Sequence, residues 1–198
     1  MRWMRGAALA TIIMLETAPI AGATETYAID QRFGDILFKV SHLGLYSSEG
    51  TFRRFTGRLT IDEAEPRNTR INVMIDTDSV AMGWAGAVAM LRSPPYFDVT
   101  RYPDARFTST RVIPERTDHY EIDGDLELRG VTQALVLHAA LLDRRPGTAA
   151  GETIADFVVT GVLRRSAFGM TADPSFISDR VNLRIHARVR LEAAAPHE

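Results

Sequence analysis

The stretch VNLRIHARVRLE, residues 181–192, alternates between apolar and polar residues without an exception. Its apolar positions are Val181, Leu183, Ile185, Ala187, Val189 and Leu191. A period of two residues over this length is typical of a β-strand with one face in water and one face buried. The apolar face could cover a closed core or a pocket for an apolar ligand, and these two alternatives predict different functions.

The same alternation recurs through the rest of the chain. The other alternating segments are residues 35–43, 57–62, 69–80, 105–113, 120–130, 133–142 and 154–163. Turn-forming residues separate them, at residues 62–68, 114–118, 128–132 and 143–152. These connections are short, so we expect neighbouring strands to pair antiparallel. Only Ala85 to Arg92 breaks the pattern and predicts about two helical turns, which Pro94 and Pro95 would end.

The fold class follows from the number and length of these strands. About eight long antiparallel strands with edges to hide favour a closed barrel or a two-sheet sandwich. Several strands reach ten or more residues, which suits a deep barrel better than a small sandwich. We therefore predict an all-β, extended eight-stranded antiparallel β-barrel with one short helical segment near residues 85–92. We expect a single domain over residues 24–198.

The N-terminus has the organisation of a secretory leader. Two arginines precede an apolar run from Gly6 to Leu15, and a small-residue site ends at Ala23, so residues 1–23 are typical of a signal peptide. The run is far shorter than the ~20 apolar residues of a spanning helix, so no transmembrane segment is expected in the mature chain. The chain has no cysteine, and the exported domain must be stabilised by packing alone.

Composition and motifs argue against several function classes. The net charge is −2, Lys39 is the only lysine, and the arginines are spread along the strands, which argues against binding of nucleic acid. The chain contains no nucleophile elbow, zinc-protease motif, phosphate-binding loop or dinucleotide-binding motif. No catalytic residue is predicted, and no spacing of histidines and carboxylates proposes a metal site.

His42 is a polar residue in an apolar set. In the segment DILFKVSHLG it shares one strand face with Ile36, Phe38 and Val40. One interpretation is a core histidine bonded to a backbone carbonyl. The other is a polar group at one end of an apolar cavity, placed to hold the head group of a ligand.

Two further strands carry candidate ligand contacts. Phe107 and Ser109 share one face of residues 105–113, and Leu126 and Leu128 share one face of residues 120–130. Gly124 lies on the same face as these leucines, and a glycine there predicts room beside the sheet.

Taken in order, several motifs resemble the YceI family of polyisoprenoid-binding periplasmic proteins. They are YAID at 27–30, FKVSHLG at 38–44, GTFRRFTGRLTID at 50–62, YFDVTRYPDARFTST at 96–110, GDLELRGVTQ at 124–133 and RRSAFGM at 164–170. The resemblance covers the whole mature chain. It implies a lipocalin-like barrel around a long apolar tunnel, which binds an isoprenoid chain such as that of a quinone, or another long-chain amphiphile. It also implies a periplasmic location, and dimers are known among members.

Two positions near the ends of the tunnel qualify the resemblance. Met90 stands where many members have a histidine, and would make that end more apolar if it faces inward. His42 does match the F-x-V-x-H pattern of the family. In the RRSAFGM motif we expect Phe168 and Gly169 to close the barrel end and Arg165 to pair with a carboxylate.

We therefore expect a periplasmic carrier that holds a polyisoprenoid, an isoprenoid quinone or a similar long-chain lipid, without catalysis and with no cofactor other than such a lipid. The predicted lining residues are Phe38, Val40, Phe52, Phe55, Phe107, Leu126, Leu128 and Phe157, with His42 or Ser109 at the head group. One alternative is a filled barrel that acts as a stress-protection or interaction module. Another is an enzyme that uses His42 on a lipid or redox molecule. An apolar mouth would also allow a homodimer.

Overall fold

The structure is a computed structural model that describes residues 24–62, 65–148 and 151–191. The expected signal peptide lies outside these ranges. The strands are β1 (Thr24–Ile29), β2 (Asp35–His42), β3 (Tyr46–Phe52), β4 (Phe55–Asp62), β5 (Arg70–Asp76), β6 (Val80–Met82), β7 (Asp104–Arg116), β8 (His119–Leu128), β9 (Val131–Pro146), β10 (Thr153–Arg164) and β11 (Ile177–Leu191). The α-helix is α1 (Ala85–Arg92), and short 3-10 helices are η1 (Gln31–Phe33), η2 (Pro66–Asn68), η3 (Thr77–Ser79) and η4 (Arg165–Phe168).

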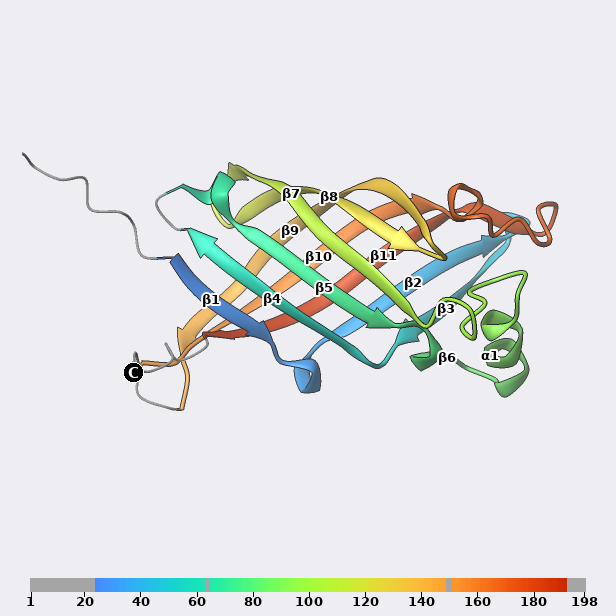
Figure 1. Ribbon diagram of the computed structural model, residues 1–198, viewed down its shortest axis with the longest axis horizontal. Helices are drawn as coiled ribbons and strands as arrows, with labels where there is room; N and C mark the ends of the chain where they lie inside the picture. The colour runs from blue at the N-terminus through green and yellow to red at the C-terminus, as the bar shows by residue number, and fades with distance from the viewer. Residues whose placement is uncertain (1–23, 63–64, 149–150, 192–198) are drawn as a thin grey trace, which may run out of the picture.

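All strands belong to one antiparallel sheet that closes on itself (Figure 1). The order around the closed ring is β1, β4, β5, β7, β8, β9, β10 and β11, and the pairing of β1 with β11 completes it. The prediction of an eight-stranded antiparallel barrel is confirmed, and the sandwich is excluded. Because the ring closes, each of these eight strands has a hydrogen-bonded neighbour on both sides over at least part of its length.

At three positions around the barrel wall, two shorter strands follow one another in place of one long strand: β1 and β2, β4 and β3, and β5 and β6. β11 pairs with β2 over its first half and with β1 over its last residues, so β1 and β2 follow one another along it. In the same way β3 and β6 extend β4 and β5. Where these strands meet, the Ser79 hydroxyl accepts hydrogen bonds from the backbone N–H groups of Arg53 and Arg54 and donates to the Asp76 carbonyl. The connection between β3 and β4 is therefore hydrogen-bonded to the connection between β5 and β6.

At the α1 end the sheet does not close, and other elements cover the gap between β6 and β7. β6 pairs with β3 and forms no ladder with β7. Helix α1 packs on β6, and Phe97, from the segment between α1 and β7, places its ring edge-on to the rings of Phe38 and Phe52, at centroid distances of 6.0 and 5.3 Å. Figure 1 shows α1 beside β3 and β6 at this end of the barrel.

The predicted elements differ from the observed ones where two short strands replace one long strand. Residues 69–80 were expected to form one strand, but η3 interrupts it between β5 and β6. β1 and β3 were not predicted, because their sequences TETYAI and YSSEGTF are largely polar or small. The helix near residues 85–92 is confirmed as α1. In the described ranges, no helix has both the length and the apolar character needed to cross a membrane.

Candidate ligand-binding cavity

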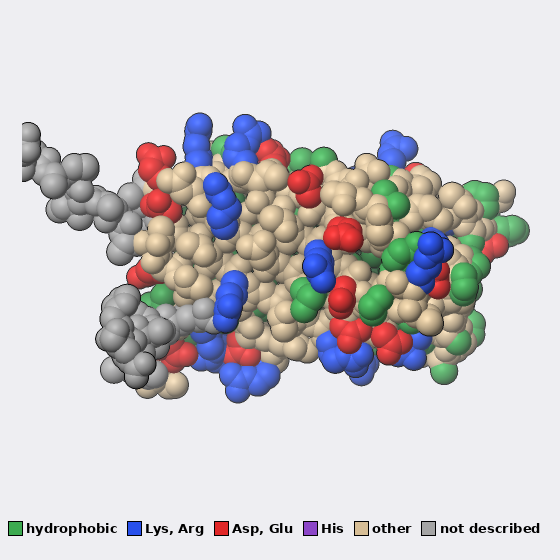
Figure 2. Space-filling model, in the orientation of Figure 1, with side chains coloured by type: hydrophobic (Ala, Val, Ile, Leu, Met, Phe, Trp, Pro, Cys, Tyr) green, Lys and Arg blue, Asp and Glu red, His purple; other side chains and the backbone are tan. Residues whose placement is uncertain are grey.

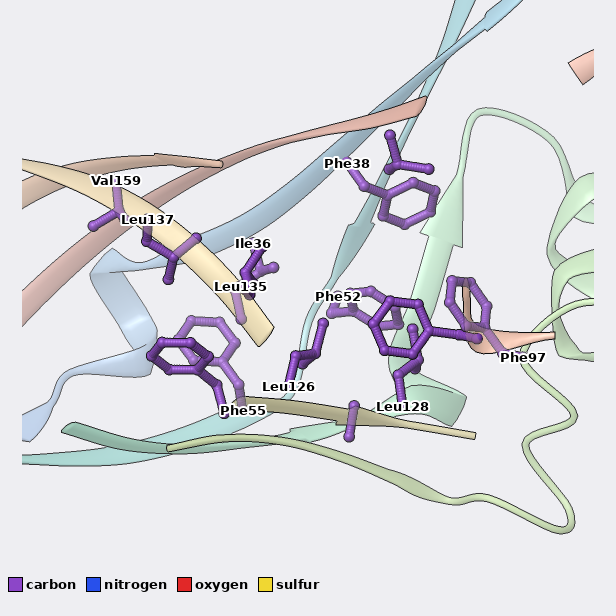
Figure 3. Packing of buried hydrophobic residues seen from close by; sticks show 14 of the residues in the cluster. Ile36, Phe38, Phe52, Phe55, Phe97, Leu126, Leu128, Leu135, Leu137 and Val159 are labelled. Atoms are coloured by element: carbon purple, nitrogen blue, oxygen red, sulfur yellow. The ribbon is translucent and has the colours of Figure 1, made fainter. Parts of the chain in front are cut away.

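The inside of the barrel contains a cavity of about 690 Å³. This volume falls within the ~300–1,000 Å³ that is typical of small-molecule sites. The residues that line it extend from His42 and Trp84 at the α1 end to Tyr27 and Asp62 at the opposite end. The lining is mainly aliphatic and aromatic, and Figure 3 shows such side chains pointing inward from several strands. The apolar positions of residues 181–189 in β11 all line this cavity, so their face does not cover a closed core.

The structure brings nine of the ten predicted site residues to the cavity. They are Phe38, Val40, His42, Phe52, Phe55, Phe107, Leu126, Leu128 and Phe157. They come from β2, β3, β4, β7, β8 and β10, and alternation along each strand turns them to the same side. Both faces of β10 are apolar in sequence, and the structure turns Phe157 and Val159 inward.

Ser109 is the exception, and its expected contact with a head group needs correction. Its side chain is buried but does not line the cavity. The Ser109 hydroxyl instead accepts a hydrogen bond of 2.8 Å from the backbone N–H of Ile71, one residue beyond the last β5–β7 pair, Asn72 with Thr108. The β7–β8 register also shifts directly after Ser109. The hydroxyl therefore satisfies a backbone donor of the barrel wall.

Gly124 also has a different role from the one expected. A Cβ atom at Gly124 would lie 2.4 Å from Cζ of Phe107, so this ring fills the room that the missing side chain leaves. The same arrangement occurs at Gly50, where a Cβ atom would lie 2.3 Å from Cζ of Phe38. Each glycine lets a phenylalanine ring come closer to the wall than a Cβ atom would allow, which leaves the space in the middle of the barrel open.

His42 combines burial with a missing hydrogen-bond partner. Its ring stacks on the ring of Tyr46 across the β2–β3 hairpin, with 4.8 Å between centroids and 6° between planes. Nε2 is buried, and none of the described residues offers it a hydrogen bond. An unsatisfied buried polar atom costs about 1–3 kcal/mol. The interpretation of His42 as a core histidine bonded to a backbone carbonyl is therefore wrong for Nε2.

The opposite end of the cavity is polar. Tyr27 is buried there, and its hydroxyl donates a hydrogen bond of 2.6 Å to Glu25 Oε2. Burial, together with this carboxylate, raises the pKa of Tyr27 to about 12, so the hydroxyl stays protonated at neutral pH. Arg144, Asp62 and Thr69 also line this end. An apolar chain would therefore find its best environment between the two ends.

Arg165 stabilises the loop beside the α1 end. Its guanidinium is buried and donates to four carbonyl oxygens, those of Met170, Ala172, Ile177 and Ser178, at 2.7–3.1 Å. The expectation that Arg165 pairs with a carboxylate is therefore wrong. These bonds tie η4 to the start of β11, while Phe168 is buried in the core and Gly169 takes a left-handed conformation after η4.

Several lining residues had no signal in the alternation. Tyr96 and Phe97 come from the irregular segment after α1. Tyr46 begins β3, Trp84 precedes α1 and Met90 lies in the last turn of α1. The Tyr96 hydroxyl donates to Asp173 Oδ2 at 2.7 Å, and burial raises its pKa to about 12. Met90 is partly exposed and lines the cavity, which makes the α1 end more apolar as expected.

One group of side chains with metal-ligating atoms occurs within the described part of the chain. Glu115, Glu121 and His138 place such atoms within 4.8 Å of one another, because β7, β8 and β9 are neighbours and Glu121 pairs with His138. Sequence spacing could not reveal this group. The three residues are exposed or half-exposed and do not line the cavity.

Comparison with known proteins places the chain in a family. The family model of the YceI-like domain matches residues 27–189. A UPF0312 protein of Pectobacterium carotovorum is 36% identical over 88% of this chain and 91% of its own length. The crystal structure of Burkholderia cenocepacia BcnA has a TM-score of 0.72 at 21% identity and covers 81% of this chain and 98% of its own. A polyisoprenoid-binding domain from Saccharophagus degradans has a TM-score of 0.59 at 16% identity, covering 84% and 98%. The chain therefore belongs to the YceI family.

Proposed function

We propose that this protein is a periplasmic carrier that binds a polyisoprenoid, an isoprenoid quinone or a similar long-chain lipid inside the barrel. The observation that carries the proposal is the apolar cavity of about 690 Å³ that extends between the two ends of the barrel. Burial of an apolar chain contributes roughly 25 cal/mol per Å², so a long chain offsets much of the cost of immobilising it. The description of the S. degradans neighbour as a polyisoprenoid-binding domain supports this ligand class.

The cavity also weighs against the filled-barrel alternative. A barrel that serves as a packed module needs side chains that meet in the middle at the density of a protein core. Here Phe38 and Phe107 lie against Gly50 and Gly124 at the wall, and open volume remains between the walls. A stress-protection module without a ligand would have no use for this arrangement.

His42 is the residue that we propose to contact the head group. Depending on its tautomer, Nε2 can accept a hydrogen bond from a hydroxyl or donate one to a carbonyl oxygen, and both groups occur on amphiphilic isoprenoids. A ligand that supplied this partner would remove the cost of the unsatisfied atom. The tail would then extend from the α1 end toward the middle of the barrel.

A binding role fits His42 better than a catalytic one. A histidine that acts as a general base is normally oriented by a carboxylate or carbonyl on its second nitrogen and faces a nucleophile. The ring of His42 is instead held by stacking on Tyr46. A different histidine, His186, has a carboxylate partner, Asp35 Oδ1 at 2.9 Å, but it belongs to the outward-facing positions of β11.

The periplasmic location rests on the N-terminal sequence. Cleavage after Ala23 would begin the mature chain at Thr24, the first residue of β1, which pairs with Asp62 of β4. Such a chain keeps every β1 residue that the structure describes. Intact-mass analysis of the protein from the periplasmic fraction should show Thr24 as the first residue. Recovery of the uncleaved chain from the cytoplasm would contradict this location.

Blocking the cavity tests the proposed binding directly. Ala139 lines the cavity from β9, whereas Ala134 is on the outer face of the same strand, so the substitutions Ala139→Phe and Ala134→Phe form a matched pair. Binding of an isoprenoid quinone delivered from detergent is expected to fall at least tenfold in Ala139→Phe and to be unchanged in Ala134→Phe. Circular dichroism checks that both variants are folded. Equal binding by both variants would contradict binding in the barrel.

A further inference from the structure

The α1 end of the barrel carries an exposed apolar rim. We define the rim as Leu43, Leu45, Tyr46, Trp84, Met90 and Phe176. Leu45 is 83% exposed, Trp84 65% and Tyr46 61%. The rim comes from three places that the fold brings together: the β2–β3 turn, α1 with the residue before it, and the loop before β11. Figure 2 shows green hydrophobic side chains gathered at this end of the molecule.

The rim surrounds an opening of the cavity. The Leu43 N–H donates to the Phe176 carbonyl at 3.1 Å, which joins the β2–β3 turn to the loop before β11. Tyr46, Trp84 and Met90 are exposed to solvent and also line the cavity. The apolar surface is therefore continuous from the outside of the protein to the inside of the barrel.

The segments around this opening are nearly free of charge. Residues 40–48 and 79–91 contain no Asp, Glu, Lys or Arg. In residues 169–178 the single charged residue is Asp173, which accepts the hydrogen bond from Tyr96. The charged groups next to these segments have partners: Arg92 at the end of α1 pairs with Asp78, and the Arg129 guanidinium donates to the carbonyl oxygens of Gly169 and Pro94.

The turns at the opposite end are strongly charged, so this character is specific to the α1 end. The described residues there include Asp62, Glu65, Arg67, Arg70, Glu115, Arg116, Asp118, Asp143, Arg144 and Arg145. The two ends of one barrel thus differ in the kind of surface they can approach.

The backbone at Leu43 adds an independent observation. Leu43 and Gly44 are the central residues of the β2–β3 turn, with φ of 52° and 69°. A turn with two positive φ values normally has Asn, Asp or Gly at the first position, and a leucine there is strained. More than half of this leucine is exposed, so burial in the barrel does not compensate for the strain. A role outside the folded chain accounts for an apolar residue at this position.

We propose that the rim docks the barrel on the surface of a lipid bilayer, so that an apolar cargo passes between membrane and cavity without crossing water. The inference rests on the proposed carrier function. Trp, Tyr and Leu at one end with few charges match the groups that anchor proteins at membrane interfaces. Docking by this end places the cavity opening against the bilayer, with His42 just inside the opening, where a head group would come to lie.

Vesicle flotation with a matched control tests the docking. The protein, expressed as the full chain and checked by intact mass for the removal of residues 1–23, is mixed with vesicles of phosphatidylethanolamine and phosphatidylglycerol. The rim variant is Leu45→Ser with Phe176→Ser, which changes two exposed rim residues that do not line the cavity. The control is Val136→Ser with Leu142→Ser, which also removes two exposed apolar residues, but from β9 outside the rim. Partition to vesicles should fall at least tenfold in the rim variant and stay at the wild-type level in the control.

Loading with an isoprenoid quinone from detergent separates this inference from the carrier function. Docking predicts that the rim variant still binds quinone from detergent but acquires it slowly from vesicles. Wild-type protein that binds quinone and does not float, or a rim variant that floats like the control, would overturn docking and leave the carrier function standing. Failure of all proteins to bind quinone would overturn the carrier function, and the inference with it. A wild-type dimer that the rim substitutions dissociate, with no flotation, would assign the rim to a second copy and overturn docking.

Discussion

The imidazole of His42 lies parallel to the ring of Tyr46, 4.8 Å away, with its Nε2 atom buried and unpaired among the described residues. The two residues are directly opposite each other in the β2–β3 hairpin, and both line the cavity. The stack fixes the direction of the imidazole before any ligand arrives. A polar atom held in this way favours ligands that bring a hydrogen-bonding group to the same place.

Substitution of His42 by phenylalanine should separate head-group recognition from capture of the chain. His42→Phe keeps a ring to stack on Tyr46 and removes the unpaired atom, so the free energy of unfolding should be unchanged or rise by about 1 kcal/mol. Affinity for an isoprenoid quinone should fall about tenfold, whereas affinity for a hydrocarbon isoprenoid such as squalene should not. His186→Phe, on the outer face, is the control. An equal loss for both ligands would contradict the assigned role of His42.

Gly50 and Phe38 test whether the wall glycines keep the cavity open. Gly50→Ala would place a Cβ atom on the Phe38 ring and push that ring into the cavity. We expect weaker lipid binding and a loss of about 1–3 kcal/mol in the free energy of unfolding, measured with urea. Gly83→Ala is the matched control, because nothing lies within 4 Å of a Cβ atom there, and it should change stability by less than about 0.5 kcal/mol. Equal effects at the two glycines would rule out the steric explanation.

Arg165 should be essential for stability even though it has no carboxylate partner. Arg165→Met leaves four carbonyl oxygens without their donor, so the free energy of unfolding should fall by at least about 3 kcal/mol. Arg165→Lys should recover only part of this, because an ammonium group cannot reproduce the planar set of donors. Arg129→Met removes two exposed bonds to carbonyl oxygens and should cost less than about 1 kcal/mol. A small effect of Arg165→Met would contradict the role given to these bonds.

Asp30 should make the barrel sensitive to acid. Hydrogen bonds from Arg32 and Arg190 hold the pKa of Asp30 well below its usual range. A depressed carboxyl pKa stabilises the folded state above the unfolded pKa of about 3.9, and this stabilisation is lost as the pH falls below that value. Asp30→Asn should therefore lower the free energy of unfolding by about 1–2 kcal/mol at pH 7. Its difference from wild type should shrink as the pH falls below 4. A difference that is constant between pH 7 and pH 3 would contradict this role.

The inward face of the barrel could be predicted because alternation is a local property of a strand. The apolar positions between Val181 and Val189, and Phe107 in β7, turn inward in the structure as their parity requires. Pro94 and Pro95 likewise marked the end of α1. These predictions needed only the preference of each short segment for one side of a sheet.

Features that depend on distant pairs could not be predicted. The hydroxyl of Ser109 is on the correct face, but its partner is the backbone of Ile71, on another strand. Burial of His42 Nε2 without a hydrogen-bond partner also arises only when loops and strands have packed. The same is true of the four carbonyl partners of Arg165. The volume of the cavity depends on how closely the rings of Phe38 and Phe107 approach Gly50 and Gly124. The alternation of apolar and polar residues does not predict these ring positions.

The most direct test of the central claim is mass spectrometry of the organic extract from protein purified, without detergent, from the periplasm of its own host. The cavity predicts a long-chain isoprenoid, an isoprenoid quinone or a similar lipid in stoichiometric amount, with much less of it in Ala139→Phe than in Ala134→Phe. Folded wild-type protein that reproducibly yields no lipid would contradict the account, and would mean that the apolar face of residues 181–189 does not contact a bound lipid.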